Sequence, residues 1–172
     1  ITTQAYSTDE REIKKTLKRY TLKNISSSGT LCSKKFRVEL SPYNNSGQIA
    51  FETSGEFIYN PETQLLKFEQ ASMFTHAEIQ AEWITNLEFF NKWNPEQIIL
   101  ELYEWDDDDG LSNDAAYYPS EGGEKAKIIL ARGNGISLHN IRTDGEAVQH
   151  EVNHHIIYDY ITYIGGQSLI LH

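Results

Sequence analysis

The chain has 172 residues, of which 39% are hydrophobic, so it is long enough to bury a core in one domain. Its formal net charge of −10 disfavours nucleic acid and anionic membranes as partners and suits a soluble protein that receives a basic partner. The single cysteine, Cys32, excludes an internal disulfide framework and a cysteine-rich zinc site. No stretch reaches the roughly 18 apolar residues of a membrane span.

We expect one α+β domain over residues 1–172, with a largely antiparallel sheet, three helices and a flexible segment at residues 1–7. The chain starts at Ile1 and not at Met, so we also expect that a segment precedes it in the full protein.

The first part of the chain predicts one helix and a series of short strands. Ser7 and Glu10 form a capping box, and apolar residues follow at helical spacing, which predicts a helix over residues 8–23. Apolar residues that alternate with polar ones, between turn residues, then predict four strands, at residues 36–40, 49–51, 57–59 and 65–68. The short connections favour an antiparallel meander.

A second helix is predicted over residues 76–92. Thr75 and Glu78 form its capping box, and the helix ends before the Asn-Pro pair at residues 94–95. One face carries an apolar stripe, which consists of Ile79, Trp83, Leu87 and Phe90. We expect this stripe to pack in the core.

The next elements are strands and loops. Residues 98–105 are apolar at positions on both faces, which is typical of a central strand. The four aspartates at residues 106–109 lack the alternating ligands of a calcium-binding loop, so they predict a solvated acidic loop. Residues 111–124 are expected to be irregular. Residues 127–131 and 136–141 flank a Gly-Asn-Gly turn and predict a hairpin.

The most specific pattern is the run Gln-His-Glu-Val-Asn-His at residues 149–154, in a last helix that is predicted to start at a capping box over residues 143–146. His150 and His154 lie one helical turn apart, so they can hold one metal ion, with zinc (Zn) or iron (Fe) expected. Glu151 between them is placed to act as the catalytic base on a water molecule at that ion. The helix is expected to end at the glycine pair near the C-terminus.

On a helical wheel, His150 and His154 share one side with Ile157 and Ile161, so we expect the histidines to point inward or into a cleft. The alternative is that they are buried neutral histidines whose ring nitrogens bond to backbone carbonyls or carboxylates. The glycine and third histidine of the long metzincin motif are absent, and no glutamate follows Glu151, which disfavours a thermolysin-like ligand set. The remaining candidates for a third ligand are His76, His139, Asp159, His172, Cys32 and the acidic run.

The C-terminal half resembles peptide deformylase. The segments that carry the resemblance are Asn94-Pro95-Glu96, Gly110-Leu111-Ser112, residues 124–128 and the Gln-His-Glu-Val-Asn-His run. The resemblance implies an α+β fold, with His150 and His154 as metal ligands and Glu151 as general base and acid in the removal of a formyl group from an N-terminal methionine. The chain departs from that family because the cysteine ligand beside Gly110 is missing, the glutamine-bearing glycine-rich loop is absent and Asn153 replaces an aspartate.

The order of the predicted elements and the acidic composition are also similar to type III secretion chaperones and to YbjN-like proteins, and residues 90–94 resemble an Asn-x-Trp-Asn segment of the latter. That resemblance implies a dimeric, non-enzymatic module that binds a peptide or protein partner, and a toxin-immunity protein has a similar composition. The sequence therefore leaves two functions open: a metal-dependent hydrolase, and an acidic binding module.

Overall fold

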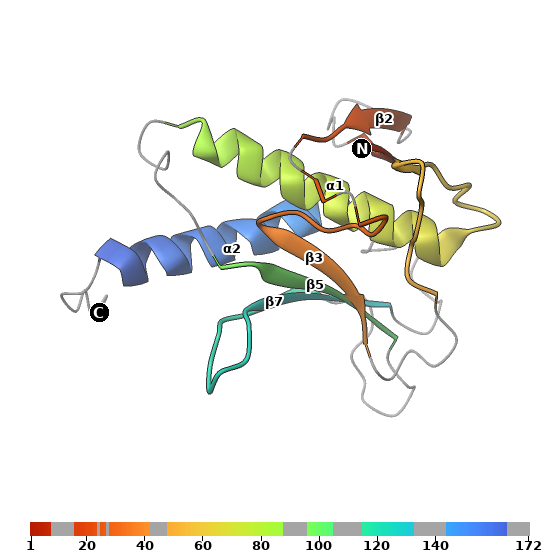
Figure 1. The fold of residues 1–172 in the computed structure, drawn as a ribbon. Coiled ribbons are helices and arrows are strands. Elements are labelled where there is room, and N and C mark those ends of the chain that lie inside the picture. Colours follow the sequence, from red (N-terminus) through yellow and green to blue (C-terminus); the bar gives the residue numbers. More distant parts are fainter. Residues whose placement is uncertain are drawn as a thin grey trace.

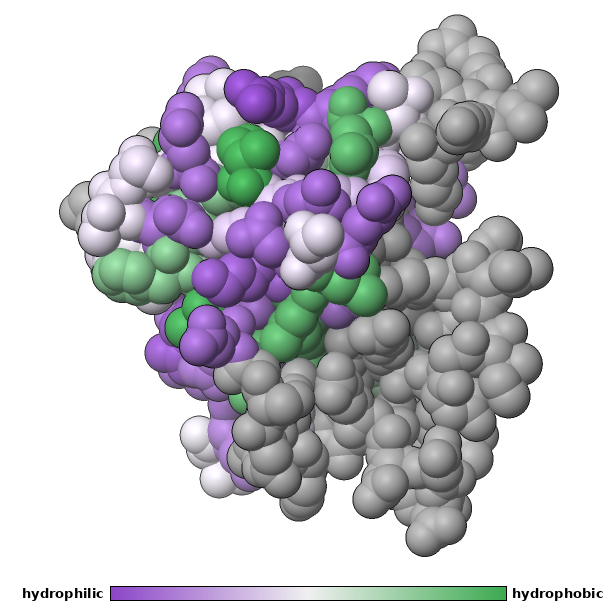
Figure 2. Space-filling view, turned by 90° about the vertical axis from the view of Figure 1, so that its right-hand side faces the viewer, coloured by the Kyte–Doolittle hydropathy of each residue, from purple (hydrophilic) through white to green (hydrophobic). Residues whose placement is uncertain are grey.

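A computed structural model describes residues 1–7, 16–23, 25–26, 28–41, 48–87, 96–104, 115–132 and 144–164 (Figure 1). In this part of the chain, neither helix is long and apolar enough to cross a membrane. On one side of the molecule, hydrophobic side chains form separate patches among hydrophilic ones (Figure 2).

The described residues form two helices and seven strands. The helices are α1 (Leu65–Thr85) and α2 (Gly145–Ile164). The strands are β1 (Thr2–Tyr6), β2 (Leu17–Thr21), β3 (Phe36–Leu40), β4 (Glu56–Phe57), β5 (Ile98–Glu104), β6 (Ala115–Tyr118) and β7 (Lys127–Arg132). The two helices pack against each other and cover one face of the sheet that contains β3, β5 and β7 (Figure 1).

The larger sheet has the strand order β3-β5-β7-β6, in which β3, β5 and β7 are parallel and β6 is antiparallel to β7. Parallel strands need a long crossover, and α1 supplies it between β3 and β5. The expectation of a largely antiparallel sheet is therefore wrong. The chain is a mixed α/β structure in which the described residues form two helices, not three, and two sheets of mixed strand direction.

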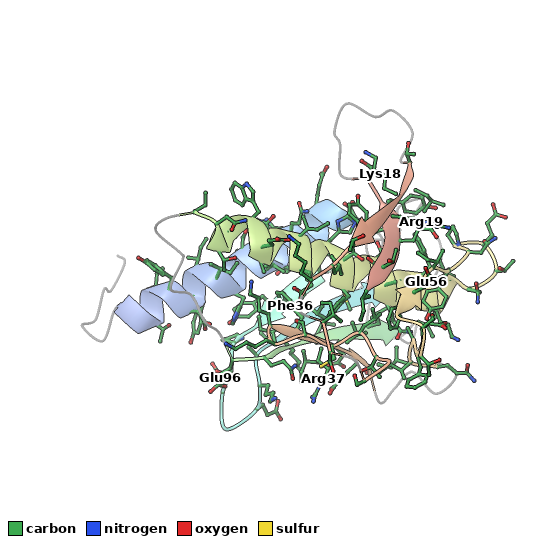
Figure 3. All side chains as sticks on the ribbon, turned by 45° about the horizontal axis from the view of Figure 1, so that its top comes forward. Lys18, Arg19, Phe36, Arg37, Glu56 and Glu96 are labelled. Carbon is green, nitrogen blue, oxygen red and sulfur yellow. The ribbon has the colours of Figure 1, made fainter. Side chains whose placement is uncertain are left out.

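Alternate residues of the larger sheet face the helices, as the period of two in a strand requires. Figure 3 shows Phe36 directed toward the helices and Arg37 directed away from them. Phe36 is fully buried, whereas Arg37 forms an ion pair with Glu39 on the other face. The side chains that the sheet contributes to the core are Phe36, Val38, Ile98, Leu100, Leu102, Ile128 and Leu130. β5 lies between β3 and β7, so the prediction of a central strand there is confirmed.

The smaller sheet has the order β2-β1-β4, with β2 antiparallel and β4 parallel to β1. A helix over residues 8–23 is wrong for residues 17–21, which form β2; residues 8–15 lie outside the described residues. In the folded chain, β2 pairs with β1, and Lys18 Nζ donates a hydrogen bond of 2.8 Å to Ser7 Oγ. These contacts stabilise the strand more than the helical spacing of apolar residues, which is only a weak local preference, would stabilise a helix.

Other strand predictions hold only in part. Residues 56–57 form β4, next to the predicted strand at 57–59, but residues 49–51 contribute only an isolated bridge between Phe51 and Thr30. Residues 111–124 contain β6 and are not irregular throughout. β7 is the first strand of the predicted hairpin; the second strand and the acidic run lie outside the described residues.

Helix α1 begins well before the predicted helix and replaces the strand predicted at residues 65–68. A short apolar run fits a strand or a helix equally well, and the residues from Phe68 to Ala77 are buried on every side of the helix, so no periodic pattern marks its start. The stripe that was expected to pack in the core does so only at Ile79, which is partly buried against it. Trp83 is 59% exposed and Leu87 is 39% exposed. Phe90 lies outside the described residues.

Helix α2 contains the histidine motif, as predicted. Asp144 caps its first turn, since Asp144 Oδ1 accepts a hydrogen bond of 3.1 Å from the main-chain N–H of Glu146. Val148, Val152 and Ile156 are buried and fix which side of α2 faces the core.

Candidate functional site

His150 and His154 converge on one point outside α2. Their Nε2 atoms are 2.9 Å apart, and their ring centroids are 4.5 Å apart at an interplanar angle of 80°. Both side chains are exposed, so of the two predicted directions, inward or into a cleft, the inward one is wrong. Ile157, which is 53% exposed, and Ile161, which is 38% exposed, follow on the same side, so this apolar stripe faces solvent and the valine stripe faces the core.

Glu151 differs from the two histidines because it is only 7% exposed. One carboxylate oxygen of Glu151 and one ring nitrogen of each histidine lie within 4.8 Å of one another. All three side chains come from less than two turns of a single helix, so their spacing follows from the helix itself and needs no contact from elsewhere. The structure therefore brings together the three site residues that the sequence predicts.

The donor set fits a metal ion. Two bonds of about 2.1 Å at a tetrahedral angle place two imidazole nitrogens roughly 3.4 Å apart. The observed separation of His150 Nε2 and His154 Nε2 is 2.9 Å, and both rings are exposed and can turn outward by that difference. Without a metal ion, one neutral ring can donate a hydrogen bond to the other at the same distance. Both arrangements need ring nitrogens that face each other.

The third-ligand candidates within the described residues do not join this group. His76 is buried in α1 and lies beside Tyr20, with ring centroids 6.3 Å apart. Asp159 pairs with His155, and Cys32 Sγ lies 3.4 Å from Gln97 Nε2. Of the side chains that the structure describes, only His150, Glu151 and His154 form a group of this kind. His139, His172 and the acidic run lie outside the described residues.

Sequence reasoning missed His155, which links the site to the sheet. This side chain is 2% exposed, its Nδ1 atom lies 3.0 Å from Tyr117 Oη, and its Nε2 atom lies 3.2 Å from Asp159 Oδ2. The spacing of four residues between His155 and Asp159 was visible in the sequence, but the contact with Tyr117 depends on the fold. Burial, with smaller contributions from Asp159 and Tyr158, raises the pKa of Tyr117, so its hydroxyl stays neutral.

Tyr117 belongs to β6, which is paired only with β7 among the described strands. Its ring packs edge-on against His155 at 5.3 Å and lies 6.1 Å from Tyr158. β6, whose other edge pairs with none of the described strands, is therefore held against the helix that carries His150 and His154. An open edge presents main-chain N–H and C=O groups that can pair with another extended segment.

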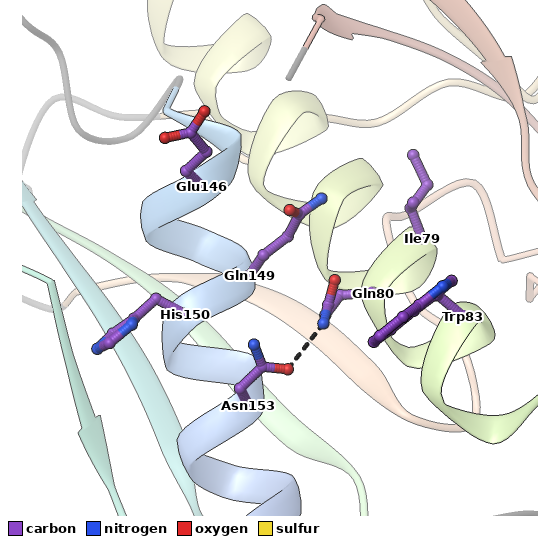
Figure 4. Close-up of a pocket in the computed structure, with 7 residues that line it drawn as sticks. All are labelled: Ile79, Gln80, Trp83, Glu146, Gln149, His150 and Asn153. Carbon is purple, nitrogen blue, oxygen red and sulfur yellow. Dashed lines mark hydrogen bonds between the residues drawn. The ribbon is translucent and has the colours of Figure 1, made fainter. Parts of the chain in front are cut away.

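A shallow groove of about 610 Å³ runs between α1 and α2 on the outer side of the helices. Gln80 Nε2 donates a hydrogen bond of 2.7 Å to Asn153 Oδ1 across it. Figure 4 shows His150 on the flank of α2 opposite to Gln149 and Asn153, so the ring of His150 lies at the border of the groove and points away from it.

Comparison with models of known protein families, with curated proteins and with solved structures gives no match. The resemblances to peptide deformylase and to secretion chaperones thus stay predictions from the sequence, and the site itself must carry any functional proposal.

Proposed function

We propose that this protein is a metal-dependent hydrolase in which His150 and His154 bind the metal ion and Glu151 is the general base. The observation that supports the proposal is the convergence of the two Nε2 atoms, 2.9 Å apart, with the Glu151 carboxylate in the same group. Zinc or iron is the proposed ion, because imidazole nitrogens suit both metals better than they suit magnesium or calcium.

When bound, the metal ion would supply a Lewis acid that lowers the pKa of water and polarises a carbonyl group. His150 and His154 would hold it at the surface of α2, where substrate can reach it. Glu151 is held by its nearly buried position, so its carboxylate stays beside the imidazoles, where it accepts a proton from water and passes it to the leaving group.

An extended peptide is the proposed substrate. β6 has an open edge among the described strands and is joined to α2 through Tyr117 and His155, so a peptide that paired with this edge would run past the site. The net charge of −10 favours a peptide with basic residues.

Metal analysis of protein purified without a histidine tag tests the proposal. We expect about one zinc or iron ion per chain, and loss of that ion in a His150→Ala/His154→Ala variant. A Gln149→Ala/Asn153→Ala variant is the matched control, because it changes two residues at the same spacing on the same helix without an imidazole. Protein that holds no metal after incubation with zinc or ferrous iron contradicts the proposal.

A binding module without catalysis is the second candidate, and the groove between α1 and α2 favours it. Trp83 borders this groove and is 59% exposed, and exposed tryptophan is common at protein interfaces. In this case Trp83→Ala should weaken binding of a basic amphipathic test peptide at least about tenfold. The His154→Ala variant, which changes an exposed residue outside the groove lining, should bind that peptide as the wild type does.

A further inference from the structure

A second group of ionisable side chains surrounds a partly enclosed cavity of about 260 Å³. Three segments meet there: one face of α1, the residues just before β3, and the residues just after β2. The residues that line it are Leu22, Lys23, Ser33, Lys34, Lys35, Glu78, Glu82 and Thr85. None of them belongs to the group formed by His150, Glu151 and His154.

Ser33 fixes one wall of the cavity. Its hydroxyl donates a hydrogen bond to Glu78 Oε1, and Ser33 Oγ accepts hydrogen bonds of 3.0 Å from the main-chain N–H groups of Lys35 and Phe36. Gln97 Nε2 also donates to the carbonyl oxygen of Ser33, at 2.6 Å. Because so many contacts hold Ser33, the Glu78 carboxylate has a fixed position on the cavity wall.

The two charged groups nearest this wall are partly buried. Burial raises the pKa of Glu78, although the hydrogen bond from Ser33 and the charge of Lys35 act in the opposite direction. Burial likewise lowers the pKa of Lys35, although Glu78 and Glu82 oppose that change. For both groups the loss of water outweighs the attraction between them. A ligand that brings opposite charges to both of them would offset the cost of burying their charged forms.

We propose that this cavity binds a small zwitterion with one carboxylate and one ammonium group, such as a free α-amino acid. Three lysines in the lining, Lys23, Lys34 and Lys35, supply positive charge for the carboxylate, and Glu78 and Glu82 supply negative charge for the ammonium group. A simple anion would meet the repulsion of the two glutamates, and a simple cation would meet that of the three lysines.

The volume of the cavity and its apolar lining residues indicate which class of amino acid it would bind. The volume of about 260 Å³ lies below the roughly 300–1,000 Å³ of pockets for drug-sized ligands, so the ligand is small. Leu22 and the methyl group of Thr85 complete the wall and offer apolar contacts to a side chain. An aliphatic amino acid such as leucine combines both requirements.

Calorimetric titration of the wild-type chain with L-leucine tests the proposal, with leucinamide and 4-methylpentanoate as probes that lack the carboxylate and the ammonium group, respectively. We expect leucine to bind, and both analogues to bind at least tenfold more weakly. Saturation by 4-methylpentanoate or by inorganic phosphate at the same concentration as leucine would show an anion site and overturn the proposal, as would the absence of binding at millimolar leucine.

Two variants locate the site. Glu78→Gln and Lys35→Met should each weaken leucine binding at least tenfold, whereas Glu62→Gln and Lys125→Met, which change exposed residues of the same types outside the cavity lining, should leave it unchanged. If a cavity variant does not fold, amide chemical shifts of the wild type give the same information: changes at Ser33, Lys35 and Thr85 support the site, and changes confined to other residues overturn it. The outcome does not depend on metal binding, so this proposal and the proposed hydrolase can fail separately.

Discussion

The histidine site and the zwitterion cavity differ in how their members are brought together and in how much water reaches them. His150 and His154 lie one turn apart on α2, and both are exposed. Ser33 and Glu78 are 45 residues apart in the chain and meet only because α1 packs beside the residues before β3. A short motif can reveal a site of the first kind, because one helix builds it. A site of the second kind exists only in the folded chain.

The histidine site and the cavity also differ in solvent access, and this difference affects the chemistry that we expect of each. In the proposed metal site, the exposed imidazoles would take up an ion without opening of the fold, and Glu151 beside them is nearly buried. In the cavity, burial raises the pKa of Glu78 and lowers that of Lys35, and both changes favour the neutral form. A ligand with opposite charges would favour the charged form of each side chain.

Glu151→Gln gives the largest expected effect and tests whether the exposed group performs chemistry. Removal of a general base lowers the rate of hydrolysis by about 10²–10⁴-fold, while His150 and His154 continue to hold the metal. The measurements are initial rates on basic peptides with a fluorescent reporter, and metal content. Glu121→Gln, at an exposed position between β6 and β7, should retain the wild-type rate. An unchanged rate in Glu151→Gln would remove this residue from the mechanism.

Tyr117→Phe has a smaller effect and tests the buried link beside the exposed site. The substitution removes the hydroxyl that lies 3.0 Å from His155 Nδ1, so we expect the free energy of unfolding to fall by about 1 kcal/mol. Urea denaturation measures it. Tyr118→Phe is the control, since Tyr118 is the next residue of β6 and is 46% exposed. Equal stability of the two variants would contradict a structural role for the contact between Tyr117 and His155.

Apart from its effect on leucine binding, Glu78→Gln should change the pH dependence of stability, and this is the smallest of the expected effects. The folded-state pKa of Glu78 is raised above its ordinary value of 4.5, so its favourable contribution is present below pH 4.5 and is lost as the pH rises through the folded-state pKa. The stability of the wild type should therefore fall, relative to that of Glu78→Gln, as the pH increases from 4.5 toward neutrality. The effect is small because Ser33 and Lys35 partly offset the burial of the carboxylate.

Parallel curves of unfolding free energy against pH for the two proteins would contradict this assignment. A Glu62→Gln variant, at an exposed position, provides the reference for loss of one surface carboxylate.

The sequence predicted the elements whose pattern is strong and local. β3, β5 and β7 lie where alternating or continuous apolar residues place them, and α2 carries the whole histidine motif. The parallel pairing of these strands could not be predicted from local spacing, because it depends on α1 serving as the crossover between β3 and β5.

The predicted direction of the histidine side chains was wrong for a different reason. α2 carries two apolar stripes, one with Val148, Val152 and Ile156, and one with Ile157 and Ile161. A helical wheel cannot tell which stripe meets the sheet, and the structure buries the first. The contact of Tyr117 with His155 and that of Ser33 with Glu78 join distant parts of the chain, so no spacing in the sequence indicates them.

The burial of α1 on every side has a consequence for cooperativity. From Phe68 to Ala77 this helix has no solvent-facing side, and it contacts β1 of the small sheet, β3 and β5 of the large sheet, and α2. A hydrogen bond of 2.7 Å between Thr75 and Thr3 joins it to β1 in the interior. Because α1 contacts both sheets through a fully buried segment, with Phe68 packed edge-on against Tyr6 of β1, we expect the two sheets to unfold together.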